Sequence, residues 1–165
     1  MRRTFLVCFL GLGLFLSSVP QAIAGWHEWS QTTRNQAIVD KSYADLGKWG
    51  GQCKKWVQKV VSLASGGAVT IPGNMPDPND YRWYSGAYVV GMSTNIRNVK
   101  PGWIVQMKFK SNGVPHTFIV VGVTSSGMYV VESNYNKNEM VGLRFWTFTD
   151  FDTKVGSFYS LYYIL

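Results

Sequence analysis

The strongest constraint on the fold is a change in the pattern of apolar and turn-forming residues at Pro101-Gly102. Beyond it, short segments rich in β-branched and aromatic residues alternate with turn-forming residues. Connections as short as Ser125-Ser126-Gly127 predict hairpins, and hairpins join antiparallel strands. The pattern therefore predicts an antiparallel sheet of about five strands, at 103–109, 116–123, 128–132, 143–148 and 158–164.

Helical periodicity precedes this sheet. Counted from Cys53, apolar residues recur at helical spacing up to Ala64, and Lys54 is placed with the polar residues on the opposite face. The pattern predicts a helix that starts at Cys53 and stops at Ser65-Gly66-Gly67. A weaker pattern predicts a helix over 31–47, capped by Thr32 or Thr33. Helices followed by an antiparallel sheet indicate an α+β domain.

The first 24 residues are typical of a secretory signal peptide. Arg2 and Arg3 precede an apolar run at 5–16, and the small-residue site Ala22-Ile23-Ala24 follows. An uncleaved membrane anchor is the alternative, but the run is shorter than the roughly 20 residues that a spanning helix needs. We expect cleavage after Ala24, export to the periplasm or the extracellular space, a single domain at 25–165, and no stable membrane insertion after cleavage.

The positive charge of the chain narrows the class of partner. The formal net charge is +7, and it stays positive once Arg2 and Arg3 are removed. A basic exported protein suits an anionic surface such as cell-wall polymers, lipopolysaccharide or acidic glycans. Nucleic acid is the other usual partner of a basic chain, but the lysines here are scattered and export argues against it.

Cysteine use singles out one residue. The chain has two cysteines, and Cys8 would leave with the signal peptide. The remaining Cys53 cannot form an internal disulfide, so it is a buried thiol, an intermolecular bridge or a reactive nucleophile. Its predicted place at a helix N-terminus favours the thiolate, because the helix dipole and the unpaired N–H groups stabilise an anion. A structural cysteine that begins the apolar stripe stays an equal alternative.

A thiolate nucleophile needs a base, and 25–165 contains only two histidines. His27 lies just after the expected cleavage site, in a segment expected to be loosely held, so we interpret it as incidental. His116 begins a predicted strand. Glu132 ends the next strand, which a hairpin would place beside His116. Asn134 shares the side of Glu132 by the two-residue period of a strand, as would Asn136 if the strand continued.

The connection at 65–102 is rich in proline and polar residues and carries several aromatic residues. Such a long loop in a small domain either lines a binding groove or is an irregular packed segment. We expect Trp83 and Tyr84 to contact substrate. A metal hydrolase using His27, Cys53, His116 and Glu132 is an alternative, but these residues lack a short metal-binding spacing, and neither a metal nor another cofactor is expected.

Four segments resemble one known family, the CHAP domains, which are cysteine- and histidine-dependent amidohydrolases/peptidases related to NlpC/P60. The resemblance covers roughly Gly47 to Ile164. The segments are Gly51-Gln52-Cys53 with Trp56-Val57, Pro101-Gly102-Trp103-Ile104-Val105, Pro115-His116-Thr117 and Val130-Val131-Glu132-Ser133-Asn134-Tyr135-Asn136. Two residues depart from the family pattern. Trp103 replaces an acidic residue, and Phe118 stands where a small residue is usual, which narrows the space beside the histidine.

The resemblance implies a papain-like α+β catalytic domain and a role for each site residue. Cys53 would be the nucleophile, His116 the base and then the acid, and Glu132 the group that orients the imidazole. Asn134 would polarise the site or contact substrate, and the Gln52 side chain would help the Cys53 N–H hold the oxyanion.

The family also implies a substrate, peptidoglycan. The bond cut would be the N-acetylmuramoyl-L-alanine amide or a peptide bond of the stem or cross-bridge, through a thioester. Two alternatives remain: a cysteine acyl enzyme acting on another amide, and a catalytically degenerate module that binds cell wall or glycan. A small immunity or inhibitor protein is a further expected partner.

Overall fold

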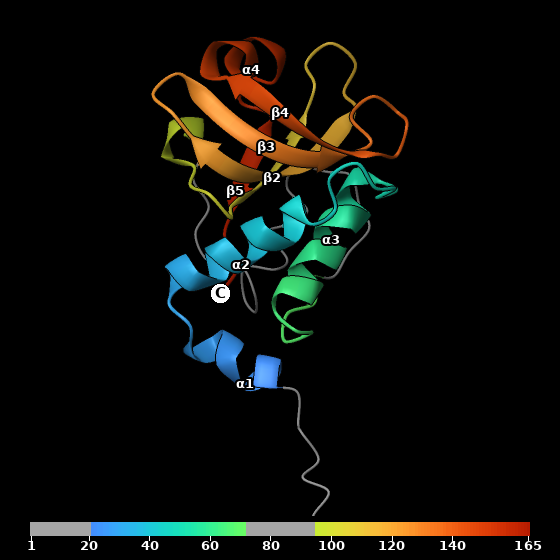
Figure 1. Ribbon diagram of the computed structural model, residues 1–165. Coiled ribbons are helices and arrows are strands. Elements are labelled where there is room, and N and C mark those ends of the chain that lie inside the picture. Colours follow the sequence, from blue (N-terminus) through green and yellow to red (C-terminus); the bar gives the residue numbers. More distant parts are fainter. Residues whose placement is uncertain (1–20, 72–94) are drawn as a thin grey trace, which may run out of the picture.

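A computed structural model describes residues 21–71 and 95–165 of the chain. Its core is a five-stranded sheet with helices on both faces (Figure 1). Helices α2 and α3 cover one face of the sheet, and α4 lies against the other. The segment with Trp83 and Tyr84 lies outside the described residues.

All neighbouring strands of the sheet run antiparallel, in the order β4-β3-β2-β1-β5. The strands are β1 (Ile104–Lys108), β2 (Pro115–Val123), β3 (Gly127–Ser133), β4 (Val141–Thr147) and β5 (Tyr159–Tyr162). The predicted α+β layout and the five-stranded antiparallel sheet are therefore confirmed. The hairpins from β1 to β4 place consecutive strands side by side, as short connections require.

The first core lies between the sheet and two helices, α2 (Gln31–Tyr43) and α3 (Cys53–Ala64). Helix α3 has the predicted bounds, because its apolar stripe from Trp56 to Ala64 packs against the sheet. Helix α2 is shorter than predicted, and its cap is Ser30, whose Oγ accepts the Thr33 N–H, in place of the predicted Thr32 or Thr33. Lys54, predicted to face solvent, is buried.

The second core lies on the other face of the sheet, under α4 (Phe148–Lys154). The sequence pattern predicts a strand over 143–148, but the helix already begins at Phe148. Phe148 belongs to α4, since the Thr147 hydroxyl accepts the Asp150 N–H and so caps a helix there. Phe151, in the middle of α4, is fully buried and completes this core.

The segment before α2 is fixed to the domain, contrary to the expectation of a loosely held start. Helix α1 (Gln21–Glu28) carries Trp26, whose buried indole donates to the Leu165 carbonyl at 2.9 Å. The Arg34 guanidinium donates to the carbonyls of Trp26 and His27, both at 2.8 Å. The His27 side chain itself is exposed.

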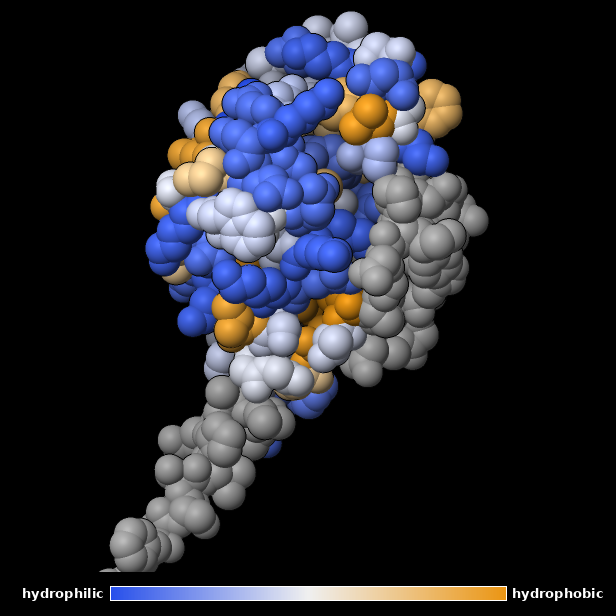
Figure 2. All heavy atoms as spheres, turned by 90° about the vertical axis from the view of Figure 1, so that its right-hand side faces the viewer, coloured by the Kyte–Doolittle hydropathy of each residue, from blue (hydrophilic) through white to orange (hydrophobic). Residues whose placement is uncertain are grey.

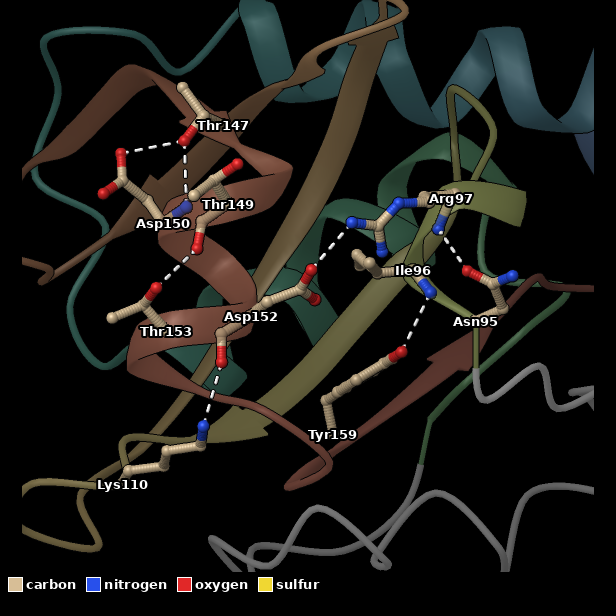
Figure 3. Close-up of polar contacts among 10 residues, drawn as sticks. All are labelled: Asn95, Ile96, Arg97, Lys110, Thr147, Thr149, Asp150, Asp152, Thr153 and Tyr159. Atoms are coloured by element: carbon tan, nitrogen blue, oxygen red, sulfur yellow. Dashed lines mark hydrogen bonds and ion pairs between the residues drawn. The ribbon is translucent and has the colours of Figure 1, made fainter.

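A cluster of polar contacts joins α4 to the short helix η2 (Ile96–Asn98) (Figure 3). Arg97 pairs with Asp152 at 2.7 Å, and the Asp152 carbonyl accepts from Lys110. The Tyr159 hydroxyl accepts the Ile96 N–H at 2.9 Å. These contacts hold the chain where it re-enters the described part of the fold at 95.

Candidate active site

The first element of the site is the turn that leads into α3. Gly51 has φ +72°, a left-handed conformation that a glycine adopts without strain. Gln52, in an extended conformation, then caps the helix, and Cys53 is its first residue. This turn places the half-buried thiol of Cys53 at the helix N-terminus, as the sequence predicted.

Cys53 and His116 interact directly and shift each other's pKa. Burial alone would raise the pKa of the Cys53 thiol. The hydrogen bond and charge of His116 outweigh burial and lower this pKa, helped by backbone hydrogen bonds from Thr117 and Lys54. Burial alone would lower the pKa of His116, but its hydrogen bonds to Cys53 and Glu132 raise it to about 9. The contact between the two side chains therefore favours the thiolate–imidazolium form of the pair over the neutral form.

Glu132 holds the far side of the imidazole. Its Oε2 lies 2.8 Å from His116 Nε2, and both side chains are nearly inaccessible, at 2% and 6% exposed. Adjacent strands bring them together, because Phe118 on β2 pairs with Glu132 on β3. With Nε2 engaged by Glu132, Nδ1 is the ring nitrogen left for the Cys53 thiol.

Arg144 is a fourth member of this chain of contacts that the sequence analysis missed. Its Nε pairs with Glu132 Oε1, and its guanidinium lies 3.5 Å from the centroid of the Tyr135 ring. Arg144 therefore balances the charge of a carboxylate that is otherwise buried. The alternation of β4 and its pairing with β3 would have placed Arg144 near Glu132, but only once the register was known.

Asn134 lies beside Gln52 rather than in line with Glu132. Strand β3 ends at Ser133, and Asn134 has φ +63°, so the alternation of the strand stops there. The period-two placement of Asn134 is therefore wrong, and the condition for Asn136, a strand that continues, is not met. The Asn134 amide donates to Gln52 Oε1 at 3.3 Å and accepts the Glu139 N–H at 3.0 Å.

Glu139, also missed from the sequence, joins the β3–β4 loop to the turn before α3. Its carboxylate accepts from Gln52 Nε2 and from Trp49 Nε1, both at 3.0 Å. Its carbonyl accepts the N–H groups of Gly50 and Gly51 at 2.8 and 3.1 Å. Glu139 therefore fixes the orientation of the Gln52 amide and of the backbone that leads to Cys53.

A cavity of about 200 Å³ opens at the thiol. Most of its lining surface is apolar, and a few polar side chains, together with the positive charge of Lys55, are available to orient an amide-bearing substrate. The residues that line it are Gln52, Cys53, Lys54, Lys55, Gln58, Gln106, Pro115, His116 and Thr117.

The described residues contain neither a metal-binding cluster nor a membrane-spanning helix. Within 21–71 and 95–165, no three His, Cys, Asp or Glu residues lie close enough together to hold a metal ion. Over the same residues, no helix has the length and apolar character needed to cross a membrane. His27 hydrogen-bonds through its carbonyl to Arg34 and takes no part in the Cys53–His116–Glu132 chain.

Comparison with known proteins agrees with this geometry. The family model described as "CHAP domain" matches residues 42–136, more than half of the chain. A search of curated proteins found no match. Two solved structures are similar, "The crystal structure of Ly7917" and "The crystal structure of Ly7917 with the hydrolyzing product of MDP", both at 16% sequence identity and a TM-score of 0.59.

The likeness to these structures concerns the fold. It covers 78% of this chain but only 61% and 62% of theirs, so the chain spans about three fifths of the length of the proteins it resembles. The matched family region contains Cys53, His116 and Glu132, the residues that the structure brings together around the cavity. The chain therefore belongs to the CHAP-domain family of cysteine-dependent amidohydrolases.

Proposed function

We propose that the protein is an exported peptidoglycan hydrolase that cuts an amide bond through a Cys53 thioester. The observation that carries the proposal is the buried Cys53–His116–Glu132 chain, which ends with the thiol at an open cavity. The bond is the N-acetylmuramoyl-L-alanine amide or a peptide bond of the stem or cross-bridge.

The geometry supports the following steps. The Cys53 thiolate attacks the carbonyl carbon, and the oxyanion receives the Cys53 N–H and the Gln52 amide. The Cys53 N–H is available because the first N–H groups of a helix have no partner within it. The His116 imidazolium protonates the leaving amine, the C–N bond breaks, and a thioester remains. His116 then takes a proton from water, which attacks the thioester and releases the carboxylic acid and the thiolate.

Two observations favour peptidoglycan as the source of the amide. One similar structure is described as a complex with "the hydrolyzing product of MDP", which says what that protein acts on. The net positive charge of this chain also suits the anionic polymers of a cell wall. Peptidoglycan lies outside the cytoplasm, so the proposal includes export, which the sequence pattern of 1–24 predicts. A small immunity or inhibitor protein that blocks the cavity is part of the same proposal.

Release of soluble muropeptides from purified sacculi tests the proposed function. Cys53→Ser and His116→Ala should each abolish release, because the first replaces the thiolate and the second removes the base. His27→Ala is the matched control and should keep activity close to wild type, since that side chain is exposed and lies outside the site. Circular dichroism checks that each variant is folded, and mass spectrometry of the products identifies the bond.

Three results would contradict the proposal in different ways. Full activity of folded Cys53→Ser would exclude the cysteine mechanism. If Cys53 of the wild-type protein forms a thioester with a non-peptidoglycan amide but the protein leaves sacculi intact, the protein is an acyl enzyme with another substrate. Wild-type protein that binds sacculi with an unreactive thiol would be a degenerate binding module.

A further inference from the structure

We propose that Trp49 is a stacking platform for a sugar ring of the glycan strand, held in position by Glu139. This inference rests on the proposed function and adds to it a saccharide-binding site beside the nucleophile. Neither Trp49 nor Glu139 belongs to the Cys53–His116–Glu132 chain. We assign both residues to substrate binding on the outer surface of the turn that leads into α3.

Trp49 is the most exposed large apolar side chain of the described residues, at 68%. Single exposed apolar side chains are common on protein surfaces, so we infer a binding role from the fixed orientation of this indole and from its neighbours. A Trp that is rigid and exposed is also the residue type most enriched among binding hot spots.

The indole is held in one orientation. Its Nε1 donates to Glu139 Oε2 at 3.0 Å, and its main chain bridges to Met140. The ring edge also lies close over Gly51, where an added Cβ would meet the indole at 3.2 Å. These contacts fix the ring at its edge and leave its exposed part to solvent, so little conformational entropy is lost when a ligand stacks on it.

The Glu139 carboxylate connects Trp49 to Gln52, the residue next to the nucleophile. Glu139 accepts from Trp49 with Oε2 and from Gln52 with Oε1. Gln52 in turn lines the cavity at Cys53. A ligand that lies on Trp49 is therefore next to the site of attack, and it extends the site beyond the cavity.

The neighbouring surface has the polar groups that a neutral sugar requires. Met140, the bridge partner of Trp49, also lines a second hollow of about 240 Å³. The side chains of Asn136 and Asn138 line the same hollow, and amides both donate to and accept from sugar hydroxyls and acetamido groups. Figure 2 shows a mostly hydrophilic surface with a few apolar residues on the side of the molecule that lies to the right in Figure 1.

An apolar ring face beside amide side chains discriminates between the two parts of peptidoglycan. The C–H groups on one face of a pyranose ring match a flat indole, and the hydroxyl groups around its edge match the amides. The stem peptide carries carboxylates, and its better partner is the cavity edged by Lys55. The structure thus assigns the glycan to the Trp49 side of Gln52 and the peptide to the cavity.

Calorimetric binding to the inactive full-length Cys53→Ala protein tests the assignment. The probes are chitooligosaccharides, which are neutral chains of N-acetylglucosamine and lack the lactyl carboxylates of peptide-free glycan strands, and stem peptides released from sacculi. Adding Trp49→Ala should raise the Kd for glycan roughly 10- to 100-fold, as truncation of an aromatic anchor does, and leave the Kd for peptide within about twofold. Trp49→Phe should keep most of the glycan affinity. Glu139→Ala should weaken glycan binding less than Trp49→Ala, because the ring stays but loses its orientation.

Leu63→Ala is the matched control. Leu63 is 52% exposed and lies ten residues along α3 from Cys53, so its loss should change neither Kd. Glycan affinity that is unchanged in Trp49→Ala, or undetectable in the parent at millimolar probe, would overturn the inference. An equal loss of peptide affinity would also overturn it, because Trp49 would then only support the shape of the site. Hydrolysis of sacculi by wild-type protein is measured separately, so a failure of the proposed function would be seen independently of glycan binding.

Discussion

At the scale of single residues, the site is a line of alternating charges. The line begins at the Cys53 thiol in the cavity and continues through the His116 imidazole on β2, the Glu132 carboxylate on β3 and the Arg144 guanidinium on β4. Each polar group has the next as its partner, so neither the buried imidazole nor the buried carboxyl lacks a hydrogen-bond partner. The chemistry therefore depends on a relay of contacts rather than on the nucleophile alone.

The lowered pKa of Cys53 predicts rapid alkylation at neutral pH. The rate of modification by iodoacetamide should follow an apparent pKa below the usual thiol value of about 8.5. His116→Ala removes the hydrogen bond and the positive charge that lower this pKa, so the apparent pKa should rise. A thiol that reacts only after denaturation, in both proteins, would show that Cys53 is structural.

The raised pKa of His116 sets the alkaline limit of activity. Its folded value of about 9 lies above the usual 6.5, so the imidazolium and its contribution to stability are fully present below about pH 6.5 and are lost as the pH rises through 9. Hydrolysis needs this proton for the leaving amine, so the rate should fall through the same range. A pH–rate profile measures it, and a flat rate to pH 10.5 would contradict the assignment.

Glu132→Gln should lower kcat without abolishing activity. An amide oxygen still accepts the imidazole N–H but does not stabilise the imidazolium by charge, so we expect a loss of roughly 10- to 1,000-fold. The alkaline limb of the pH–rate profile should also move to lower pH, which a merely structural role would not cause. Arg144→Lys keeps the positive charge next to Glu132 and is the milder comparison. An equal partial loss in both variants, with the alkaline limb unmoved, would show that Glu132 supports only the shape of the site.

At the scale of elements, the turn before α3 and the β3–β4 loop form one unit. Glu139 binds the backbone of that turn through its carbonyl, and the Ser133 hydroxyl donates to the Gly51 carbonyl at 2.6 Å. A single loop therefore sets the position of both the nucleophile and the oxyanion groups.

Gly50→Ala should disturb this unit. A Cβ at Gly50 would lie 2.5 Å from Ser133 Oγ and 2.6 Å from Val141 Cγ2, so the turn and the sheet must move apart. Such overpacking costs about 1–3 kcal/mol, which lowers the Tm by several degrees in a domain of this size. We expect kcat to fall as well, since the same shift moves Cys53.

Gly122→Ala is the control for this substitution. A Cβ at Gly122 meets nothing closer than the Tyr129 ring at 3.5 Å, an ordinary contact, so both the Tm and kcat should stay close to wild type. Differential scanning calorimetry and the sacculus assay give the two measurements. Equal effects of the two substitutions would show that the close packing at Gly50 does not position the nucleophile.

The elements were largely predictable, and the exceptions have physical causes. Periodicity gave α3 and the five strands because their apolar faces are buried in continuous stripes. Helix α4 was missed because it buries little more than Phe148 and Phe151, which continue the apolar pattern of β4. The site residues Cys53, His116 and Glu132 could be predicted because each lies at the end of a predicted helix or strand. A hairpin also pairs the strands that carry His116 and Glu132. Arg144 and Glu139 could not be predicted, because their positions depend on the register of β4 and on a loop with residues at positive φ.

At the scale of the whole molecule, the sheet separates two cores and the site lies at one end of it. Helices α2 and α3 form the first core and α4 the second, and strands β2 and β3 contribute residues to both. The line from His116 to Arg144 crosses β2, β3 and β4, and each of these strands contributes buried residues to both cores, so both cores hold the line in place.

Export and cleavage after Ala24 remain a prediction at this scale. N-terminal sequencing of the exported protein should begin at Gly25. Replacing Ala22 and Ala24 by bulky residues should block this cleavage and reduce the amount of processed protein. Exported protein that still begins at Met1 would favour the membrane-anchor alternative.

The hydrogen bond from Trp26 to Leu165 has a consequence for the order of folding. It joins positions 139 residues apart, and closing so long a loop costs entropy that only an otherwise formed domain recovers. We expect Trp26 to dock late, after the sheet has formed around β1 and β2. A chain still engaged in translocation would thus keep the region next to the predicted cleavage site open to a peptidase, and docking would then close that region to later proteolysis.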